Sequence, residues 1–161
     1  MTAIGVNAII GDQSYVEKHG VQPEGVPEKE RIQTHLSFVE ELLRQSTVDH
    51  LTLAQRENRE KVIDILNGYW QQGEFPSDFE HDDARRPCFI DRRGTLCALG
   101  FLMKETEGLE TAQAVNDGHQ FAYVSEMSLP ALALWADRYG LSRRECAMVQ
   151  PTYTPTPFPG C

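Results

Sequence analysis

Four cysteines and five histidines are the residues of this chain best suited to covalent chemistry or metal binding. Cys97 opens the run CALGFLMKE, which is typical of a helix start, where free backbone amides and the helix dipole stabilise a thiolate. His119 follows it in the sequence and could act as a base, with Asp91 to orient the imidazole. These three residues form one candidate catalytic set, a cysteine nucleophile for a hydrolase or transferase.

The same cysteines also allow a structural interpretation. The segment between Cys88 and Cys97 contains Arg-Arg-Gly, a turn in which only Gly94 is relaxed at positive φ. A β-hairpin over 88–97 would place Cys88 opposite Cys97, with Cβ atoms about 4.5–5.5 Å apart. That separation is close to disulfide geometry.

Four cysteines allow three pairings, and spacing favours Cys88 with Cys97 and Cys146 with Cys161. We favour this disulfide interpretation over the nucleophile, so no catalytic set is preferred. If the thiols are instead free and reactive, Cys97, His119 and Asp91 are the alternative.

An acidic loop, Glu74–Asp83, contains weak candidates for metal ligands in His81, Asp82 and Asp83. Carboxylates and an imidazole are ligands for divalent cations. The loop nevertheless lacks the turn glycine and terminal glutamate of a calcium loop, and the chain has no Cys-x-x-Cys pair for zinc. The sequence therefore favours neither a metal nor any other cofactor.

Helical patterns account for most of the chain. Apolar residues recur at helical spacing over Arg31–Gln45, and a capping box at Thr52 and Gln55 begins a second helix that ends at Gly73. Pro130 and a capping box at Ser142 and Glu145 each predict a further helix start. We expect a mainly α domain over 31–151 with a small central β-hairpin, an irregular N-terminal arm over 1–30 and an extended Pro-rich tail over 152–161.

Residues 131–150 could form a helix-turn-helix DNA-binding unit. Gly140 would supply the turn, while Ala136, Leu141, Cys146 and Val149 would supply the close crossing and the core. The formal net charge of −9 opposes binding to a phosphate backbone. We therefore keep DNA binding as a second alternative and expect no nucleic-acid partner.

Four motifs in the chain resemble those of a family of small, functionally uncharacterised bacterial proteins, many of them made with secretory leaders. The matching segments are HLSFVEELLR, GEFP, FIDRRGTLCALGFL and GLSRRECAMVQPTY. The resemblance covers about residues 31–153 and implies a shared fold, a role for residues 87–101 and, for some members, life outside the cytoplasm. It implies no activity.

These observations lead to one functional expectation. Because catalytic constellations are lacking and both ends of the chain are irregular, we predict a non-enzymatic binding or accessory subunit of a larger protein assembly. Its partner is expected to be a protein, a homo-oligomer is left open, and no segment is apolar enough to span a membrane. The first residues lack the basic flank of a signal peptide, but the resemblance shifts the expected location from the cytoplasm towards the periplasm or the outside of the cell.

Overall fold

The computed structural model describes residues 5–157, and these contain seven α-helices and one 3₁₀ helix. The elements in chain order are α1 Gln13–His19, α2 Glu28–Gln45, α3 Leu53–Gln72, α4 Ala98–Glu107, α5 Leu109–His119, the 3₁₀ helix η1 Val124–Glu126, α6 Pro130–Arg138 and α7 Arg143–Val149. None of these helices is long and apolar enough to cross a bilayer.

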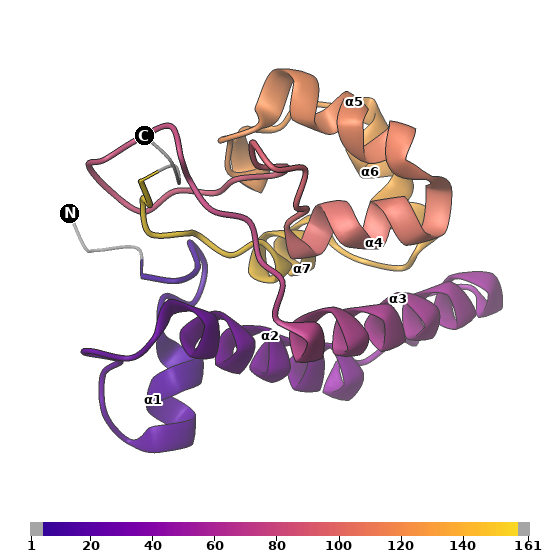
Figure 1. The fold of residues 1–161 in the computed structure, drawn as a ribbon. Coiled ribbons are helices and arrows are strands. Elements are labelled where there is room, and N and C mark those ends of the chain that lie inside the picture. Colours follow the sequence, from indigo (N-terminus) through magenta and orange to yellow (C-terminus); the bar gives the residue numbers. More distant parts are fainter. Residues whose placement is uncertain (1–4, 158–161) are drawn as a thin grey trace.

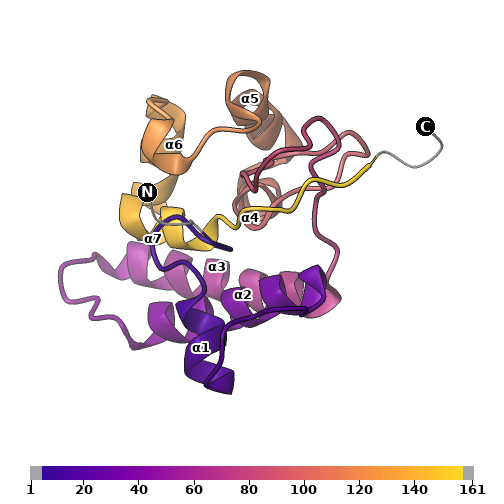
Figure 2. The same cartoon turned by 90° about the vertical axis from the view of Figure 1, so that its left-hand side faces the viewer.

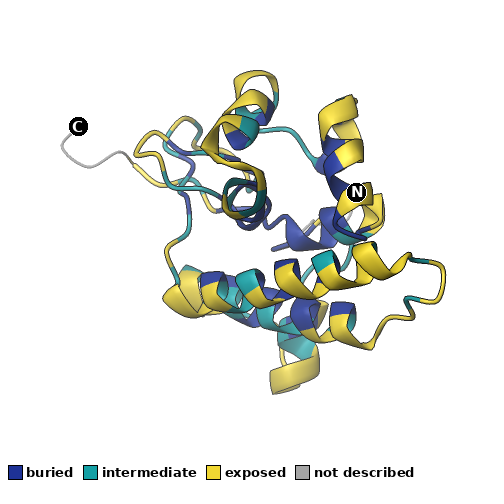
Figure 3. Cartoon of the chain, turned by 90° about the vertical axis from the view of Figure 1, so that its right-hand side faces the viewer, coloured by how far each residue is buried: buried dark blue, intermediate teal, exposed yellow. Residues whose placement is uncertain are grey.

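The helices form two layers with α7 between them (Figure 1). The antiparallel pair α2 and α3 makes one layer together with α1, and α4, α5 and α6 make the other. Apolar residues at helical spacing line the inner faces of the pair, so burial is confined to one side of each helix (Figure 3). On α2 these residues are Ile32, Leu36, Val39 and Leu43, and on α3 they are Val62, Ile63 and Leu66.

The predicted helix ends are confirmed where the signal is local. Thr52 and Gln55 form the reciprocal capping box of α3, and Ser142 and Glu145 form that of α7. Gly73 ends α3 in the left-handed conformation at φ +71°. Pro130 occupies the first turn of α6.

The predicted central β-hairpin over 88–97 is wrong, because the described residues contain no β-strand. One isolated antiparallel bridge joins Ile90 to Leu96, a register one residue away from the predicted one. The ladder does not extend because the backbone N–H of Phe89 donates to the carbonyl of Gln120 at 2.7 Å, and Cys97 already caps α4. The segment is therefore a tight turn that leads directly into a helix.

Both ends of the described chain are docked on the core. Asn7 is fully buried, and its side-chain amide donates to the carbonyls of Ala147, Met148 and Gln150 at 2.9–3.0 Å. Thr152 donates its backbone N–H to the carbonyl of Val6 at 2.8 Å, so the two end segments lie side by side across α7 (Figure 2).

The N-terminal arm was predicted as irregular over 1–30, and within it the structure shows α1. The Pro-rich tail is held at Tyr153, which is 1% exposed and exchanges backbone hydrogen bonds with Arg86. The buried segments 5–7 and 151–153 thus belong to the folded domain.

Candidate functional site

Asp91 organises the turn that follows residue 90. Its carboxylate accepts backbone N–H groups from Ser77 at 3.0 Å and from Arg93 and Thr95 at 2.9 Å. A carboxylate that satisfies three amides is a structural group, because most of its acceptor positions are already used. Asp91 therefore holds the turn and does not orient a histidine.

Cys97 lies in an environment unlike that of a nucleophile. It is 1% exposed and caps α4, with its sulfur accepting the N–H of Gly100 at 3.3 Å. Burial raises the pKa of this thiol to about 12, although the helix amides act in the opposite direction. A reactive cysteine needs a lowered pKa and solvent access, and Cys97 has neither.

His119 ends α5, and its Nδ1 is buried without a hydrogen-bond partner among the residues described. No hydrogen bond or ion pair joins it to Cys97 or Asp91 in that part of the chain. The structure therefore does not assemble the alternative catalytic set that the sequence suggested.

The described cysteines are all free and buried. Cys88 and Cys97, predicted to pair, form no disulfide, because the hairpin that would oppose them is replaced by the turn. The thiol of Cys88 points towards the carbonyl of Ser77 at 3.9 Å, and burial raises its pKa. Cys146 is also a free, buried thiol, and the predicted partner Cys161 lies outside the described residues.

The acidic loop is organised by Asp78, a residue that was not singled out in the sequence. Asp78 is completely buried and contacts Nδ1 of His81 at 2.9 Å and Nε of Arg86 at 3.3 Å. Asp82 is exposed, and Asp83 pairs with Arg86 instead. Across the described residues, no group of three or more His, Cys, Asp or Glu side chains is arranged to hold a metal ion.

The helix-turn-helix interpretation of 131–150 conflicts with the burial of its second helix. Cys146, Ala147, Met148 and Val149 of α7 are buried, and α7 packs against α2, α4 and α6. A recognition helix must expose one face to enter the major groove. Arg143 moreover donates to the carbonyls of Val124 and Met127, so it is part of the fold.

Arg59 is an unexpected buried charge that links α3 to α7. It is 4% exposed and forms two hydrogen bonds with the carboxylate of Glu145, at 2.6 and 2.9 Å. It also donates to the carbonyls of Gly140 at 2.7 Å and Leu43 at 3.0 Å. Nothing in the local sequence distinguishes Arg59 from Arg56, which is exposed.

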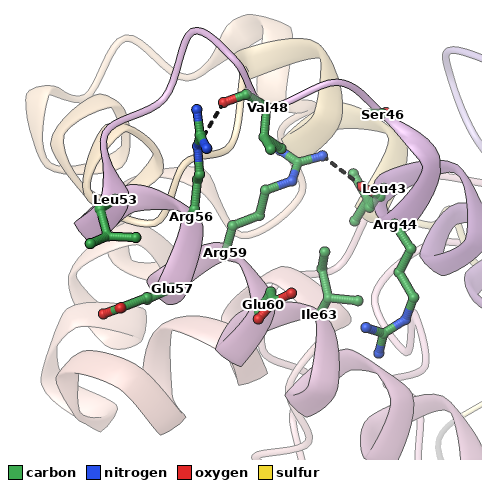
Figure 4. Close-up of a pocket in the computed structure, with 10 residues that line it drawn as sticks. All are labelled: Leu43, Arg44, Ser46, Val48, Leu53, Arg56, Glu57, Arg59, Glu60 and Ile63. Atoms are coloured by element: carbon green, nitrogen blue, oxygen red, sulfur yellow. Dashed lines mark hydrogen bonds between the residues drawn. The ribbon is translucent and has the colours of Figure 1, made fainter.

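Next to Arg59, a hollow of about 480 Å³ opens between the adjoining ends of α2 and α3 (Figure 4). We call it the α2–α3 groove. Its floor and rim include the apolar residues Leu43, Val48, Leu53 and Ile63, and its remaining lining is Arg44, Ser46, Arg56, Glu57, Arg59 and Glu60.

Two arginines of the groove reach across it from α3 towards the loop and the end of α2 (Figure 4). Arg56 donates to the backbone carbonyls of Val48 at 3.1 Å and Asp49 at 3.4 Å. It has no carboxylate partner within the described chain. The Nε–H of Arg59 is buried with no acceptor in this same part of the chain.

Comparison of the chain with protein families, with curated proteins and with solved structures found no match in any of the three. The resemblance noted in the sequence is thus not tested by these comparisons and stays a prediction.

The polar residues on which that resemblance rests serve the fold. Nε2 of His35 contacts the carbonyl of Met148 at 2.8 Å, and Glu40 accepts hydrogen bonds from the side chains of Asn67 and Trp70. Gln150 accepts the N–H of Val124 at 3.0 Å. Because these groups are used internally, a binding site has to be sought on other surfaces.

Proposed function

We propose that this chain is a non-enzymatic binding or accessory subunit of a larger protein assembly, and that its α2–α3 groove receives a short apolar segment of a protein partner. The single observation that carries this proposal is the exposure of Leu53 at the groove. Its side chain is 72% exposed, more than that of any other large hydrophobic residue described as exposed. Such a leucine at the rim of a hollow with an apolar floor offers area that a partner can bury.

The polar atoms of the groove support a peptide as the occupant. Arg56 is exposed, and its guanidinium has N–H donors beyond those bonded to the carbonyls of Val48 and Asp49. The carbonyl oxygens of an extended segment are acceptors of the matching kind. A peptide that packs an apolar side chain against Leu53 and places a backbone carbonyl at Arg56 would use both features.

The buried thiols also support a non-catalytic role. Burial raises the pKa values of Cys97 and Cys146 to about 12, which keeps both groups as neutral thiols near pH 7. The catalytic alternative based on Cys97 and His119 therefore lacks the thiolate that it requires.

Selection from a random peptide library on the intact chain tests the proposal. Selected peptides should carry apolar residues, and Leu53→Asp should weaken their binding about tenfold or more, since burying one leucine is worth about 1.5–3 kcal/mol. Fluorescence anisotropy of labelled peptides measures the affinity.

Leu134→Asp on α6 is the matched control, because Leu134 is 64% exposed and lies outside the groove. This variant should bind the selected peptides as the unmodified chain does. Failure to select any peptide, or equal weakening by the two substitutions, would contradict the proposal.

A further inference from the structure

A second hollow, of about 320 Å³, lies along the seam between α1 and α2. We call it the α1–α2 hollow. Its lining is mostly polar: Ser14, Glu17 and Lys18 come from α1, and Thr34 and Ser37 come from α2. Phe38 and Glu41 of α2 complete it.

The polar side chains of this hollow are not used by the fold. None of them forms a hydrogen bond or ion pair with another residue of the described chain. In the α2–α3 groove, by comparison, Arg44, Arg56 and Arg59 are all bonded internally.

Ser14 is the decisive residue of the α1–α2 hollow. It is 1% exposed, and its hydroxyl is buried without a hydrogen-bond partner among the residues described. A buried hydroxyl that lacks a partner costs stability. A ligand atom that reaches this hydroxyl would remove the cost, so the residue favours an occupied site.

The mixture of groups defines the class of ligand. Hydroxyls both donate and accept, Glu17 and Glu41 only accept, and Lys18 only donates. A simple cation would leave the hydroxyl donors unmatched and would face Lys18, whereas a simple anion would face two carboxylates. A neutral polyol matches every group.

Phe38 narrows the class of ligand further, because it adds an aromatic side chain to a lining that is otherwise polar. A sugar ring has hydroxyls at its edge and C–H groups on its faces. Its faces can pack on an aromatic ring while its edge bonds to carboxylates and hydroxyls. The volume of the hollow, about 320 Å³, is near the lower end of the usual range for ligand sites.

We propose that the α1–α2 hollow is a binding site for a small saccharide, of one or two sugar units. This site is independent of the α2–α3 groove, and either can exist without the other. The bound sugar would donate to Glu17 and Glu41 and would give the Ser14 hydroxyl a partner.

Nuclear magnetic resonance titration of the full chain tests the site with glucose, mannose and N-acetylglucosamine as separate probes, at millimolar concentration. At least one sugar should shift the backbone amide signals of Ser14, Ser37 and Phe38 in a saturable way. Spermidine and acetate are the cationic and anionic probes, and neither should shift these signals. Saturable binding of either ion, or the absence of any shift with all three sugars, would overturn the proposal.

Three substitutions separate recognition from folding. Glu41→Gln removes one exposed acceptor and should weaken sugar binding about fivefold, while Glu110→Gln on α5, also exposed, should leave it unchanged. Ser14→Ala should raise the melting temperature of the sugar-free chain, because it removes an unsatisfied buried hydroxyl, and should weaken binding. Binding unaffected by both Glu41→Gln and Ser14→Ala would show that the sugar occupies another place.

Discussion

His35 is the residue whose protonation the fold resists most clearly. It is fully buried, and burial lowers its pKa from 6.5 to about 4, although its hydrogen bond to the carbonyl of Met148 acts in the opposite direction. The folded chain thus keeps this imidazole neutral where the unfolded chain binds a proton. Stability is fully present above pH 6.5 and is lost as the pH falls from 6.5 towards 4.

We expect the unmodified chain to lose about 2 kcal/mol more of its unfolding free energy between pH 7 and pH 5 than a His35→Gln variant. The glutamine keeps a donor for the Met148 carbonyl but does not titrate. Urea unfolding at the two pH values measures the difference. Equal pH dependence in the two chains would contradict the assignment of the effect to His35.

The described thiols give a second prediction at this scale. In a Cys161→Ser variant, Cys88, Cys97 and Cys146 should react only very slowly with a thiol reagent near pH 8, because they are buried and their pKa values are raised. In denaturant all three should react at once. Mass spectrometry after timed alkylation counts the modified groups.

Rapid labelling of Cys97 alone in the folded variant would revive the catalytic alternative. His119→Ala provides the control, since it should not change the labelling rate unless the imidazole acts on that sulfur.

At the scale of elements, the turn between α6 and α7 shows how closely the two layers meet. Gly140 has φ +67°, and a Cβ atom placed on it would lie 2.8 Å from the carbonyl oxygen of Gln55 on α3. The sequence indicated a glycine turn here, and the structure adds that α3 passes directly against it. Both the conformation and the contact exclude a side chain.

Gly140→Ala should therefore destabilise the chain by about 2 kcal/mol or more. Gly68→Ala is the matched substitution, because Gly68 lies within α3, is exposed, and has open space for at least 4 Å around the position that a Cβ atom would take. This second change should stabilise by up to about 1 kcal/mol through helix propensity. Thermal unfolding of both variants measures the two changes in stability. No loss of stability in Gly140→Ala would show that α3 can move aside.

Helix caps were predictable from the sequence because their signals are local. Thr52 with Gln55, and Ser142 with Glu145, need only residues three apart, and both boxes form. The hairpin over 88–97 failed for the opposite reason. Its turn was recognised, but the amide of Phe89 is taken by Gln120, and no local pattern reveals a competitor that far along the chain.

The whole molecule determined the site residues that the sequence did not reveal. Asp78, Arg59 and Ser14 look like ordinary surface residues in the sequence, and they become distinctive only through burial against distant segments. The residues that stood out in the sequence proved to be structural: Cys97 caps α4, and Asp91 holds a turn. A sequence pattern identifies residue types that are capable of chemistry. Which polar groups remain without an internal hydrogen-bond partner, and so could bind a ligand, is visible only in the structure.

The docking of Asn7 on the end of α7 bears on how the chain reaches its native state. Asn7 is synthesised well before its acceptors at positions 147, 148 and 150. Closing so long a loop makes folding slow relative to a bundle with only neighbouring contacts. The docking of Asn7 therefore cannot form before α7 has been synthesised.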